Sequence, residues 1–291
     1  MLRFTGLFIF CALALSCDEV NGVLNKDKKK EITYSFACLD STVSAKPISR
    51  KLDKASGILR DLAISKKSIT DSLQVAYGKE FHEEMMADGS FKLVNNPALQ
   101  QKLNTVLKDL LAVREDPSKI EYSIYILQDT TINAFTFGGR IYVTQAMLDK
   151  CSHSDALLYA IVGHEIGHSE MGHIKKTIQE LELSHDIFGE NGTTVFEIKK
   201  MLTASFNQKN ELEADYYGIN LTNELGYDVC TAVSFWKEMA SSENRYNQLE
   251  DFFRTHPFSN LRAQCLTDHI RTNFGKDCGI LKKAAVMPQV R

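Results

Sequence analysis

The sequence has no excess of basic residues. Lysine and arginine together number 34 against 37 aspartate and glutamate residues, which gives a formal net charge of -3. A nucleic-acid-binding surface needs clustered positive charge, so the composition argues against a nucleic-acid partner. The one basic run, Lys26 to Lys30, lies near the N-terminus, where a solvated linker is the ordinary explanation.

Long apolar runs are also missing beyond the N-terminal segment. No later stretch approaches the roughly 18 consecutive apolar residues of a membrane helix, so we predict no further span. No C-x-x-C pair occurs, which leaves little support for a cysteine-based zinc site or thioredoxin-like redox chemistry. What remains is a globular composition, with 44% of the 291 residues hydrophobic and 24% charged. That is enough for one well-buried core, with room for two lobes.

The N-terminal segment MLRFTGLFIFCALALSC is typical of an export signal. Arg3 precedes an apolar run from Phe4 to Leu15, which is too short for a bilayer that needs about 20 residues. Ser16 and Cys17 resemble the end of a bacterial lipobox, although Ala14 stands where leucine is usual. We therefore expect a signal peptide over residues 1–16 and export to the bacterial periplasm or envelope, with lipid on Cys17 as a membrane anchor. The alternative is an ordinary cleaved signal with an incidental cysteine.

The chain has seven cysteines. Removal of Cys11 with the signal and lipidation of Cys17 leave five. An exported chain permits disulfides, and an odd number means that at least one cysteine is free or pairs outside the chain. The remaining five are Cys38, Cys151, Cys230, Cys265 and Cys278, of which the last three are favoured to bond. The pairing itself cannot be read from the sequence.

The rest of the chain divides by its pattern. Residues 17–68 are mixed and polar and are interpreted as an extension or linker, residues 69–275 as a folded domain, and residues 276–291 as a tail. The domain opens with a predicted helix that starts at Asp71, the candidate N-cap, and ends at Gly89. Its apolar stripe is Leu73, Ala76, Tyr77, Phe81 and Met85. A second helix starts at Pro97, a residue suited to a first turn. Its apolar face is Leu99, Leu103, Val106, Leu107, Leu110 and Leu111.

The period then changes to that of a strand. Apolar residues alternate over residues 120–126, and two β-rich runs flank Gly138 and Gly139, which predicts a hairpin whose second strand is Arg140 to Thr144. One long helix is expected from Ser152 or Ser154 to Leu183, followed by a loop over residues 185–194. Helices are expected over 195–206, over 208–225 with Gly226 as its end, over 230–242, and at the end of residues 254–272. The predicted fold is α+β, mainly helical with a small sheet or hairpin.

The stretch YAIVGHEIGHSEMGH places three of the eight histidines on a helix that should be buried. His164 and His168 are four residues apart, so both rings leave the same helix face with about 6 Å of axial rise between them. Their nitrogens can converge on one ion at about 2.1 Å each. Glu165 projects beside that ion, where a carboxylate can take a proton from metal-bound water. Gly163 and Gly167 cost helix stability, so we expect close backbone packing or room for substrate there.

A catalytic zinc site takes three protein ligands and keeps a fourth position for water. The pattern H-E-x-x-H-x-x-G-x-x-H is not met, because Met171 and Ile174 stand at its last glycine and histidine positions. Gly172 and His173 are one residue out of register with that pattern. The third ligand must therefore come from another element.

The stretch NQKNELEADYYGINL offers acidic residues instead. Glu211 and Asp215 are four residues apart and share a helix face, whereas Glu213 is expected to point elsewhere. Ala214 and Gly218 are small enough to let this helix approach the histidine helix. We predict Glu211 as the third ligand and Asp215 as the partner of the outer N–H of one ligating histidine. The alternatives are an exposed acidic helix and a histidine helix whose rings are simply hydrogen-bonded.

At these motifs the chain resembles a known family. HEIGH followed by ELEAD is similar to the gluzincin metallopeptidases of family forty-eight, which include the CAAX prenyl protease, HtpX and the envelope proteases BepA and LoiP. AYGKEFHEE, NAFTFGGRIYVT and THPFSNLR resemble further segments of that family. The resemblance covers about Ile69 to Thr272 and implies a zincin-like fold with the small sheet beside the H-E-x-x-H helix. The chain lacks the predicted spans of the prenyl-protease and HtpX branches, so it resembles the envelope branch more.

The resemblance implies a zinc metalloendopeptidase domain over residues 69–275, with one zinc ion per subunit. His164, His168 and Glu211 would hold the zinc. Glu165 would act as general base and then as proton donor to the leaving amine. The implied partner is a polypeptide substrate, and misfolded envelope protein is the substrate class that the family suggests.

The tetrahedral oxyanion needs a further donor, and His256 is the best candidate because the family has a histidine there. Arg262 is a weaker candidate, since it can instead pair with a carboxylate. Two alternatives stay open for His256: it binds the zinc in a resting form, or it is a structural loop histidine.

Substrate is expected to bind as an extended strand. The predicted open sheet edge lies within Gly138 to Thr144 and consists of Gly139, Arg140, Ile141, Tyr142 and Val143. The aromatic side chains nearby are expected in the core, with substrate pockets as the alternative; they are Phe135, Phe137 and Tyr142. Trp236 is also expected in the core. Five histidines without a companion at ligand spacing are interpreted as structural: His82, His153, His173, His185 and His269.

Two other classes of function remain. The first is a non-proteolytic chaperone or assembly factor for envelope proteins that keeps its zinc for structure. Glu165 argues against it, because a structural site needs no base. The second is a structural lipoprotein with an accidental motif, which the presence of both Glu211 and Asp215 disfavours.

Overall fold

The computed structural model describes residues 31–40, 69–188, 207–242, 256 and 260–279. The chain divides into two compact units, Met1–Thr33 and Tyr34–Arg291, and every described helix and strand belongs to the second. The expected signal peptide, Cys17 and the helix predicted over residues 195–206 lie outside the described residues. Among the helices that are described, none is both long and apolar enough to cross a bilayer.

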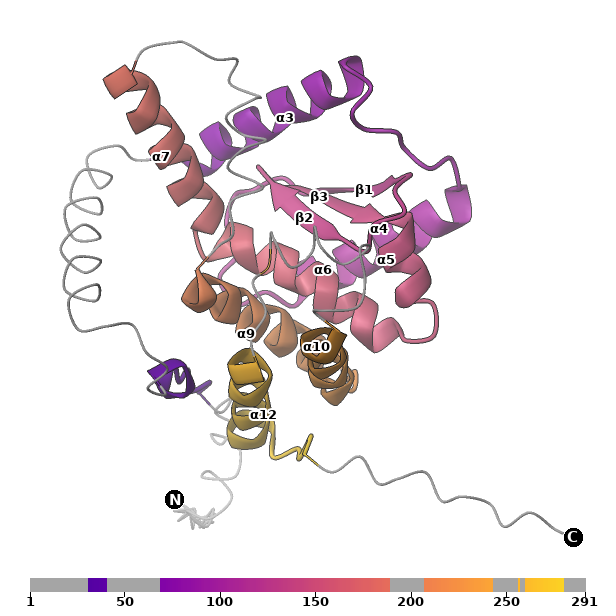
Figure 1. Cartoon of the computed structure of the whole chain (residues 1–291), viewed down its shortest axis with the longest axis vertical. Helices are drawn as coiled ribbons and strands as arrows, with labels where there is room; N and C mark the ends of the chain where they lie inside the picture. Colours follow the sequence, from indigo (N-terminus) through magenta and orange to yellow (C-terminus); the bar gives the residue numbers. More distant parts are fainter. Residues whose placement is uncertain (1–30, 41–68, 189–206, 243–255, 257–259, 280–291) are drawn as a thin grey trace, which may run out of the picture. The chain divides into compact units, whose positions relative to one another are not determined.

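The described part of the second unit is mainly helical, with one small sheet (Figure 1). In chain order its elements are η1 (Ala37–Asp40), α3 (Asp71–Ala87), α4 (Pro97–Ala112), β1 (Ser123–Leu127), β2 (Ala134–Phe137), β3 (Arg140–Thr144), α5 (Gln145–Lys150), α6 (Asp155–Glu170), α7 (His173–Phe188), α9 (Gln208–Glu224), α10 (Cys230–Ser242) and α12 (Asn260–Phe274). This arrangement confirms the predicted α+β class.

The sheet has the strand order β1-β3-β2. β2 and β3 form the predicted hairpin about Gly138 and Gly139, both of which have positive φ. β1 pairs with β3 in parallel, from Ser123 opposite Arg140 to Leu127 opposite Thr144. β3 is therefore the central strand. The prediction that Gly139, Arg140, Ile141, Tyr142 and Val143 form an open edge is wrong, because β1 and β2 already pair with this strand on its two sides. Among the described residues β2 has no strand beyond it.

The two faces of the sheet pack against different helices, with α3 over one face and α6 under the other (Figure 1). Successive β residues point to opposite faces. Ile141 and Val143 therefore join the main core, which includes α4, α6, α9 and α10, while Tyr142 and Phe137 join a second cluster with α3 and α7. Phe137 and Tyr142 are fully buried, so the expected core role of these aromatic residues is confirmed, as it is for Trp236.

Helix α3 is present as predicted, but its cap and its buried face differ. The Thr70 hydroxyl, not the Asp71 carboxylate, accepts the N–H of Leu73 at the N-cap. Leu73 is 38% exposed, and the buried face consists of Gln74, Gly78, Phe81 and Met85. A Cβ on Gly78 would lie 2.6 Å from the carbonyl oxygen of Gly138. The buried face is thus set by the close approach of the helix to the hairpin turn, which the apolar stripe alone does not reveal.

Helix α4 agrees with its prediction, with Pro97 in the first turn and Leu103, Val106, Leu107 and Leu110 buried. The short helix α5 was not predicted. It is capped by Thr144, the last residue of β3, whose hydroxyl accepts the N–H of Met147.

The long helix predicted to Leu183 is two helices. Ser154 caps α6, which ends at Glu170, and α7 begins at His173. Gly172 between them has a φ of 77°, a left-handed conformation that no continuing helix adopts. The loop predicted from His185 is also wrong in its first residues, since α7 continues to Phe188.

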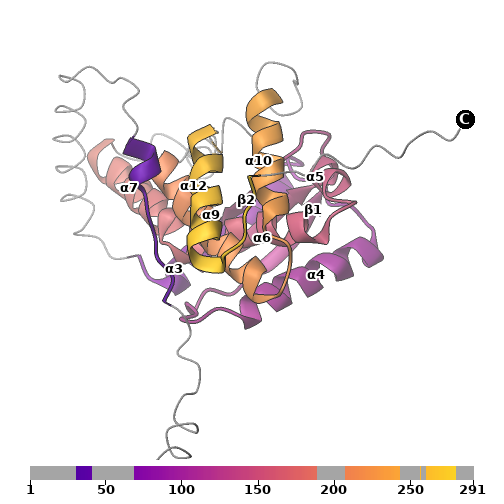
Figure 2. The same ribbon diagram turned by 90° about the horizontal axis from the view of Figure 1, so that it is seen from below.

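Two disulfides lie within the described residues. Cys230 bonds Cys278, and Cys38 bonds Cys265, which links η1 to α12. The ribbon of Figure 2 shows η1, in indigo, beside α12, in yellow. The odd cysteine is Cys151, which is buried and whose thiol pKa burial raises to about 12. Bonding of Cys230, Cys265 and Cys278 agrees with the prediction. The role of Cys38 was not predicted, because only packing of η1 on α12 brings it 5.6 Å from Cys265, Cα to Cα.

We expect His269 on α12 to make the stability of the protein depend on pH. Its Nε2 lies 2.8 Å from Asn220 Oδ1, its Nδ1 lies 3.1 Å from Asn273 Nδ2, and its ring stacks on Tyr216. These partners suit a neutral ring, and burial lowers the pKa of His269 to about 4. The unfolded chain takes up the proton near pH 6.5, so this stabilisation is complete above that pH and is lost as the pH falls toward 4, by about 3 kcal/mol.

The measurement is urea unfolding between pH 7 and pH 4.5. His269→Gln should lose less stability on acidification than the wild type, whereas His153→Gln, at an exposed histidine, should follow the wild type. Parallel losses in the wild type and His269→Gln would contradict the prediction.

Candidate functional site

The site begins with the contact between α6 and α9. A Cβ on Gly218 would lie 2.5 Å from the backbone nitrogen of His164, and one on Gly163 would lie 2.9 Å from the Cα of Gly218. Gly167 approaches Ala214 equally closely. The two helices therefore touch through their backbones, as predicted from these small residues.

This contact brings the predicted ligands together in a buried cluster. The Nε2 atoms of His164 and His168 are 3.1 Å apart. Glu211 Oε2 lies 3.6 Å from His164 Nε2, and Glu211 Oε1 lies 3.4 Å from His168 Nε2. His256 joins them, with Nδ1 3.2 Å from Glu211 Oε2 and 3.3 Å from His164 Nε2. One ligand atom from each of these four residues lies within 4.8 Å of the others.

The donor set fits zinc. Glu211 is fully buried, and its Oε1 has no hydrogen-bond partner among the described residues. The Nε2 atoms of His164 and His168 face each other, and both Nδ1 atoms are engaged elsewhere. Burial lowers the pKa of His168, while His256 and Arg262 hold the pKa of Glu211 well below its usual value despite burial. Two imidazoles and a carboxylate are ligands that zinc takes in catalytic sites.

Asp215 lies at the outer nitrogen of His164, the position predicted for it. Its Oδ1 is 2.8 Å from His164 Nδ1. Arg262 donates to the same carboxylate from Nε and from one terminal nitrogen, and its other terminal nitrogen is 2.9 Å from Glu211 Oε2. Arg262 is fully buried. Of its two predicted roles, the geometry favours carboxylate pairing, because all its nitrogens face Asp215 and Glu211.

Glu165 lies beside the cluster and is 2% exposed. Burial raises its pKa, and the nearby His256 and His164 oppose that shift. A carboxyl group with a raised pKa next to the ligand atoms can accept a proton and release it again.

His256 connects the cluster to the sheet. Its Nε2 lies 3.1 Å from the carbonyl oxygen of Ala134 on β2 and 3.7 Å from Glu165 Oε1. Burial by itself lowers the pKa of His256, but Glu211 and Glu165 outweigh it and raise the pKa to about 9. The structure thus places His256 within reach of the ligand atoms rather than in a remote loop.

Sequence reasoning missed two residues beside the cluster. His173, which was interpreted as structural, has its Nδ1 3.1 Å from His168 Nδ1. Glu213, which was expected to point elsewhere, has its Oε2 3.0 Å from His173 Nε2. Gly172 was the available signal, because a glycine after the motif allows the helix to end and the next residue to turn back.

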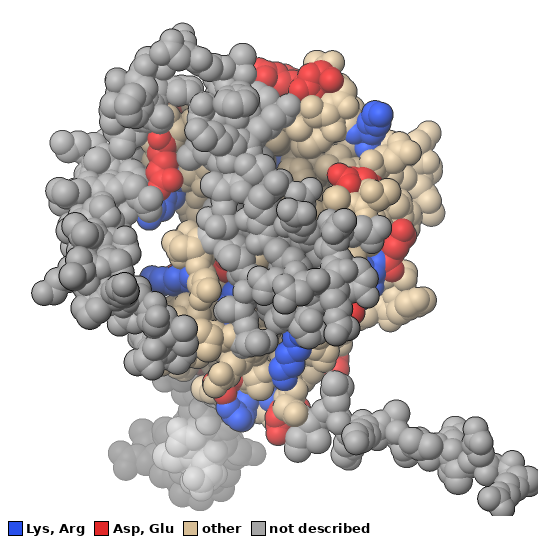
Figure 3. Space-filling view, in the orientation of Figure 1, with Lys and Arg blue, Asp and Glu red and all other residues tan. Residues whose placement is uncertain are grey.

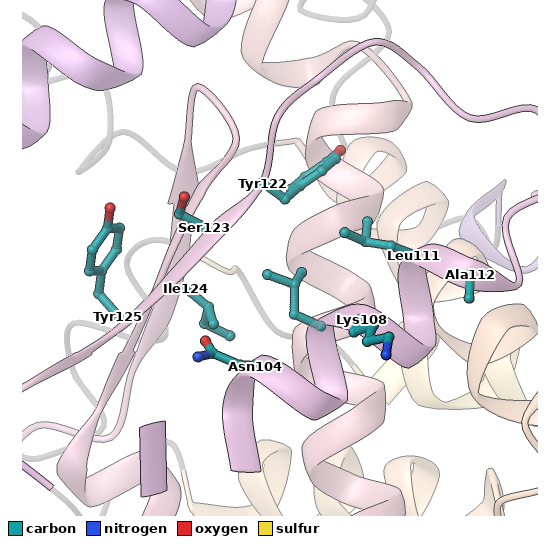
Figure 4. A pocket seen from close by; sticks show the side chains of 9 residues that line it. Asn104, Lys108, Leu111, Ala112, Tyr122, Ser123, Ile124 and Tyr125 are labelled. Atoms are coloured by element: carbon teal, nitrogen blue, oxygen red, sulfur yellow. The ribbon is translucent and has the colours of Figure 1, made fainter. Parts of the chain in front are cut away.

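A cavity of about 690 Å³ lies between α4 and β1, lined by residues such as Lys108, Leu111, Tyr122 and Tyr125, and none of the cluster residues lines it (Figure 4). On the face in Figure 3, acidic and basic side chains are interspersed over the described surface, without a broad basic patch.

The sequence of the chain matches the model of a known protein family. The family model "Peptidase family M48" matches residues 97–270, more than half of the chain. The chain belongs to peptidase family M48. The matched region includes His164, Glu165, His168, Glu211 and His256.

Three relatives illustrate the similarity within this family. Mitochondrial metalloendopeptidase OMA1 of Schizosaccharomyces pombe is 29% identical over 56% of this chain and 50% of its own length. Metalloprotease LoiP of Escherichia coli is 27% identical over 71% of this chain and 84% of its own length. The Beta-barrel assembly-enhancing protease of Yersinia pestis is 24% identical over 78% of this chain and 50% of its own length. The chain thus spans about half the length of OMA1 and of the Yersinia relative.

We expect Gly218→Ala to weaken zinc binding. Its Cβ would lie 2.5 Å from the nitrogen of His164 and 2.7 Å from the carbonyl carbon of Gly163, so the two helices must move apart. The stability should fall by about 1–3 kcal/mol, as for other overpacked sites. Gly78→Ala is the matched control, because it meets the backbone of Gly138 at 2.6 Å, away from the cluster. Both variants should be destabilised in urea, but only Gly218→Ala should lose zinc to a competing chelator. Equal zinc affinity in the two would contradict the prediction.

Proposed function

We propose that this protein is a zinc-dependent endopeptidase of the bacterial cell envelope. The observation that carries the proposal is the buried cluster of His164, His168 and Glu211 with Glu165 at its side. Membership of peptidase family M48 supports a protease role, and the similarity to the metalloproteases above supports a polypeptide substrate.

In this proposal His164, His168 and Glu211 hold the metal, and Asp215 keeps the outer nitrogen of His164 protonated. Bound zinc supplies a Lewis acid that polarises the peptide carbonyl and lowers the pKa of water. Glu165 takes the proton of the attacking water on its carboxylate and passes it to the leaving amine nitrogen as the peptide bond breaks. Its burial keeps bulk water from competing for that proton.

Two roles are proposed for His256: a zinc ligand in the resting form and a donor to the oxyanion during catalysis. Its Nδ1 lies among the ligand atoms, which supports a resting form with three histidines and Glu211 around the zinc. Swung away, the ring would be free to donate to the oxyanion. X-ray absorption of the zinc-loaded protein distinguishes these states, since three imidazoles support the resting ligand and two exclude it.

Substrate pairing is proposed at β2 rather than β3. The carbonyl of Ala134 lies on the outer edge of β2, where His256 Nε2 contacts it. An extended peptide that displaced His256 would find this carbonyl available to accept one of its N–H groups. Displacement of His256 would therefore expose both the edge of β2 and the metal site to the substrate.

The envelope location rests on the N-terminal segment and on the similarity to LoiP and the Beta-barrel assembly-enhancing protease. We propose a signal peptide over residues 1–16, lipid on Cys17, a linker over 17–68, a peptidase domain over 69–275 and a role in envelope protein quality control. Mass spectrometry of the mature protein tests the anchor, and an unmodified N-terminus away from Cys17 rejects it.

A non-proteolytic chaperone or assembly factor for envelope proteins is the second candidate. The observation in its favour is that Glu165 and all four cluster residues are at most 3% exposed, so substrate cannot reach them without a movement. A protein that keeps its zinc only for structure would show this same burial.

The deciding experiment combines zinc content with cleavage of an unfolded protein such as casein. The wild type should bind one zinc ion, cleave casein, lose cleavage to a chelator and recover it with zinc. Glu211→Gln should lose both zinc and cleavage. Binding of zinc without cleavage by the wild type, even after long incubation, would favour the chaperone, and absence of zinc would reject both functions.

A further inference from the structure

The two histidines of the H-E-x-x-H motif have different partners at their outer nitrogens. His164 Nδ1 meets the Asp215 carboxylate directly, at 2.8 Å. His168 Nδ1 instead meets the Nδ1 of His173, at 3.1 Å. The far nitrogen of His173, Nε2, lies 3.0 Å from Glu213 Oε2. Each motif histidine is therefore linked at its outer nitrogen to a carboxylate. Asp215 contacts His164 directly, whereas Glu213 is linked to His168 through the imidazole of His173.

The hydrogen bonds that run from His168 through His173 to Glu213 can have only one donor-to-acceptor order. His168 turns its Nε2 toward the cluster, so its Nδ1 carries the hydrogen and donates it to His173 Nδ1. His173 must then carry its own hydrogen on Nε2, which donates to Glu213. The reverse order would require an ionised carboxylate to donate, which it cannot do. Glu213 thereby determines the tautomer of both rings.

The backbone is arranged for this contact. In a continuous helix a residue five positions after His168 would lie about 140° around the axis, facing away from it. The break between α6 and α7 turns His173 back toward His168 instead. Gly172 has a φ of 77°, and a Cβ placed on it would meet nothing within 4 Å. This glycine is therefore required for the turn and not for close packing.

We infer that His173 and Glu213 are positioning residues for the metal site: they fix the tautomer and the ring orientation of His168. The inference rests on the proposed zinc function. His173 is 6% exposed, so its neighbours restrict the rotation of its ring. Glu213 also lies near Lys209, whose Nζ is 3.5 Å from Glu213 Oε1. Outer partners of this kind change metal affinity by about 10–100-fold when they are removed.

The test is zinc affinity, measured by competition with a chromophoric chelator. His173→Phe keeps a ring but removes the acceptor, so its affinity should fall about 10–100-fold. His173→Asn places an amide oxygen near the position of Nδ1 and should stay close to the wild type. Glu213→Gln keeps an acceptor without charge and should fall between them. His153→Phe, the same change at an exposed histidine, is the matched control and should be neutral.

A second readout separates positioning from folding. The visible spectrum of the cobalt-substituted protein reports ligand geometry, and it should change in His173→Phe but not in His173→Asn. Wild-type zinc affinity and spectrum in His173→Phe would overturn the inference and leave the proposed function intact. Equal losses in the Asn and Phe variants would also overturn it, because the acceptor would then be irrelevant. If His173→Phe does not fold, Glu213→Gln decides, and wild-type affinity there overturns the inference. Absence of zinc from the wild type would overturn both proposals.

Discussion

Glu165→Gln is expected to reduce casein cleavage by about 10²–10⁴-fold, the usual contribution of a positioned general base. The amide is close in size to the carboxylate, so the buried site should keep its packing. It cannot take a proton from water, however, and the proton for the leaving amine would have no carrier. The zinc content should remain one ion per chain, because Glu165 lies beside the four ligand atoms and is not one of them.

The measurement pairs initial rates of cleavage with zinc content in the same preparation. Glu170→Gln is not a suitable control, since Glu170 is held by Arg114, Ser118 and Tyr122. Glu121→Gln is preferable, because Glu121 is exposed and lies outside the cluster. Full activity of Glu165→Gln would reject the assigned base, and loss of zinc from it would mean that Glu165 helps to hold the metal.

Arg262→Met is expected to lower the free energy of unfolding by about 3–5 kcal/mol, the usual result of leaving buried charge uncompensated. Arg262 is fully buried and bonds both Asp215 and Glu211, which are themselves buried. Methionine fills much of the side-chain volume but supplies no charge or donor. Zinc would place positive charge near Glu211, so the loss should be larger after chelation than with zinc bound.

Urea unfolding with and without chelator measures both effects. Arg271→Met is the matched control, because Arg271 lies on the same helix with 58% of its side chain exposed and pairs with Asp268. That change should stay within about 1 kcal/mol of the wild type. A comparably small loss in Arg262→Met would show that the buried carboxylates do not depend on the arginine.

The sequence by itself determined the features that depend on the period of the helix and on the residues of a turn. His164 and His168 share a face because they are four residues apart, and Glu211 and Asp215 share one for the same reason. Close packing of these two faces was predicted from their small residues, which are Gly163, Gly167, Ala214 and Gly218. The hairpin followed from Gly138 and Gly139, which supply the positive φ of its turn.

Only the tertiary structure decided the features that depend on contacts between distant segments. β3 became central because β1 pairs with it in parallel, and no local pattern states which strands are neighbours. Cys38 bonds Cys265, 227 positions away, and no local pattern states which cysteines are neighbours either. The partner of His168 required the break at Gly172, where one left-handed residue turns a predicted continuous helix into two and brings His173 back to the site. Short-range periodicity is encoded in neighbouring residues, whereas the pairing of strands, cysteines and buried rings is set by the packing of whole elements.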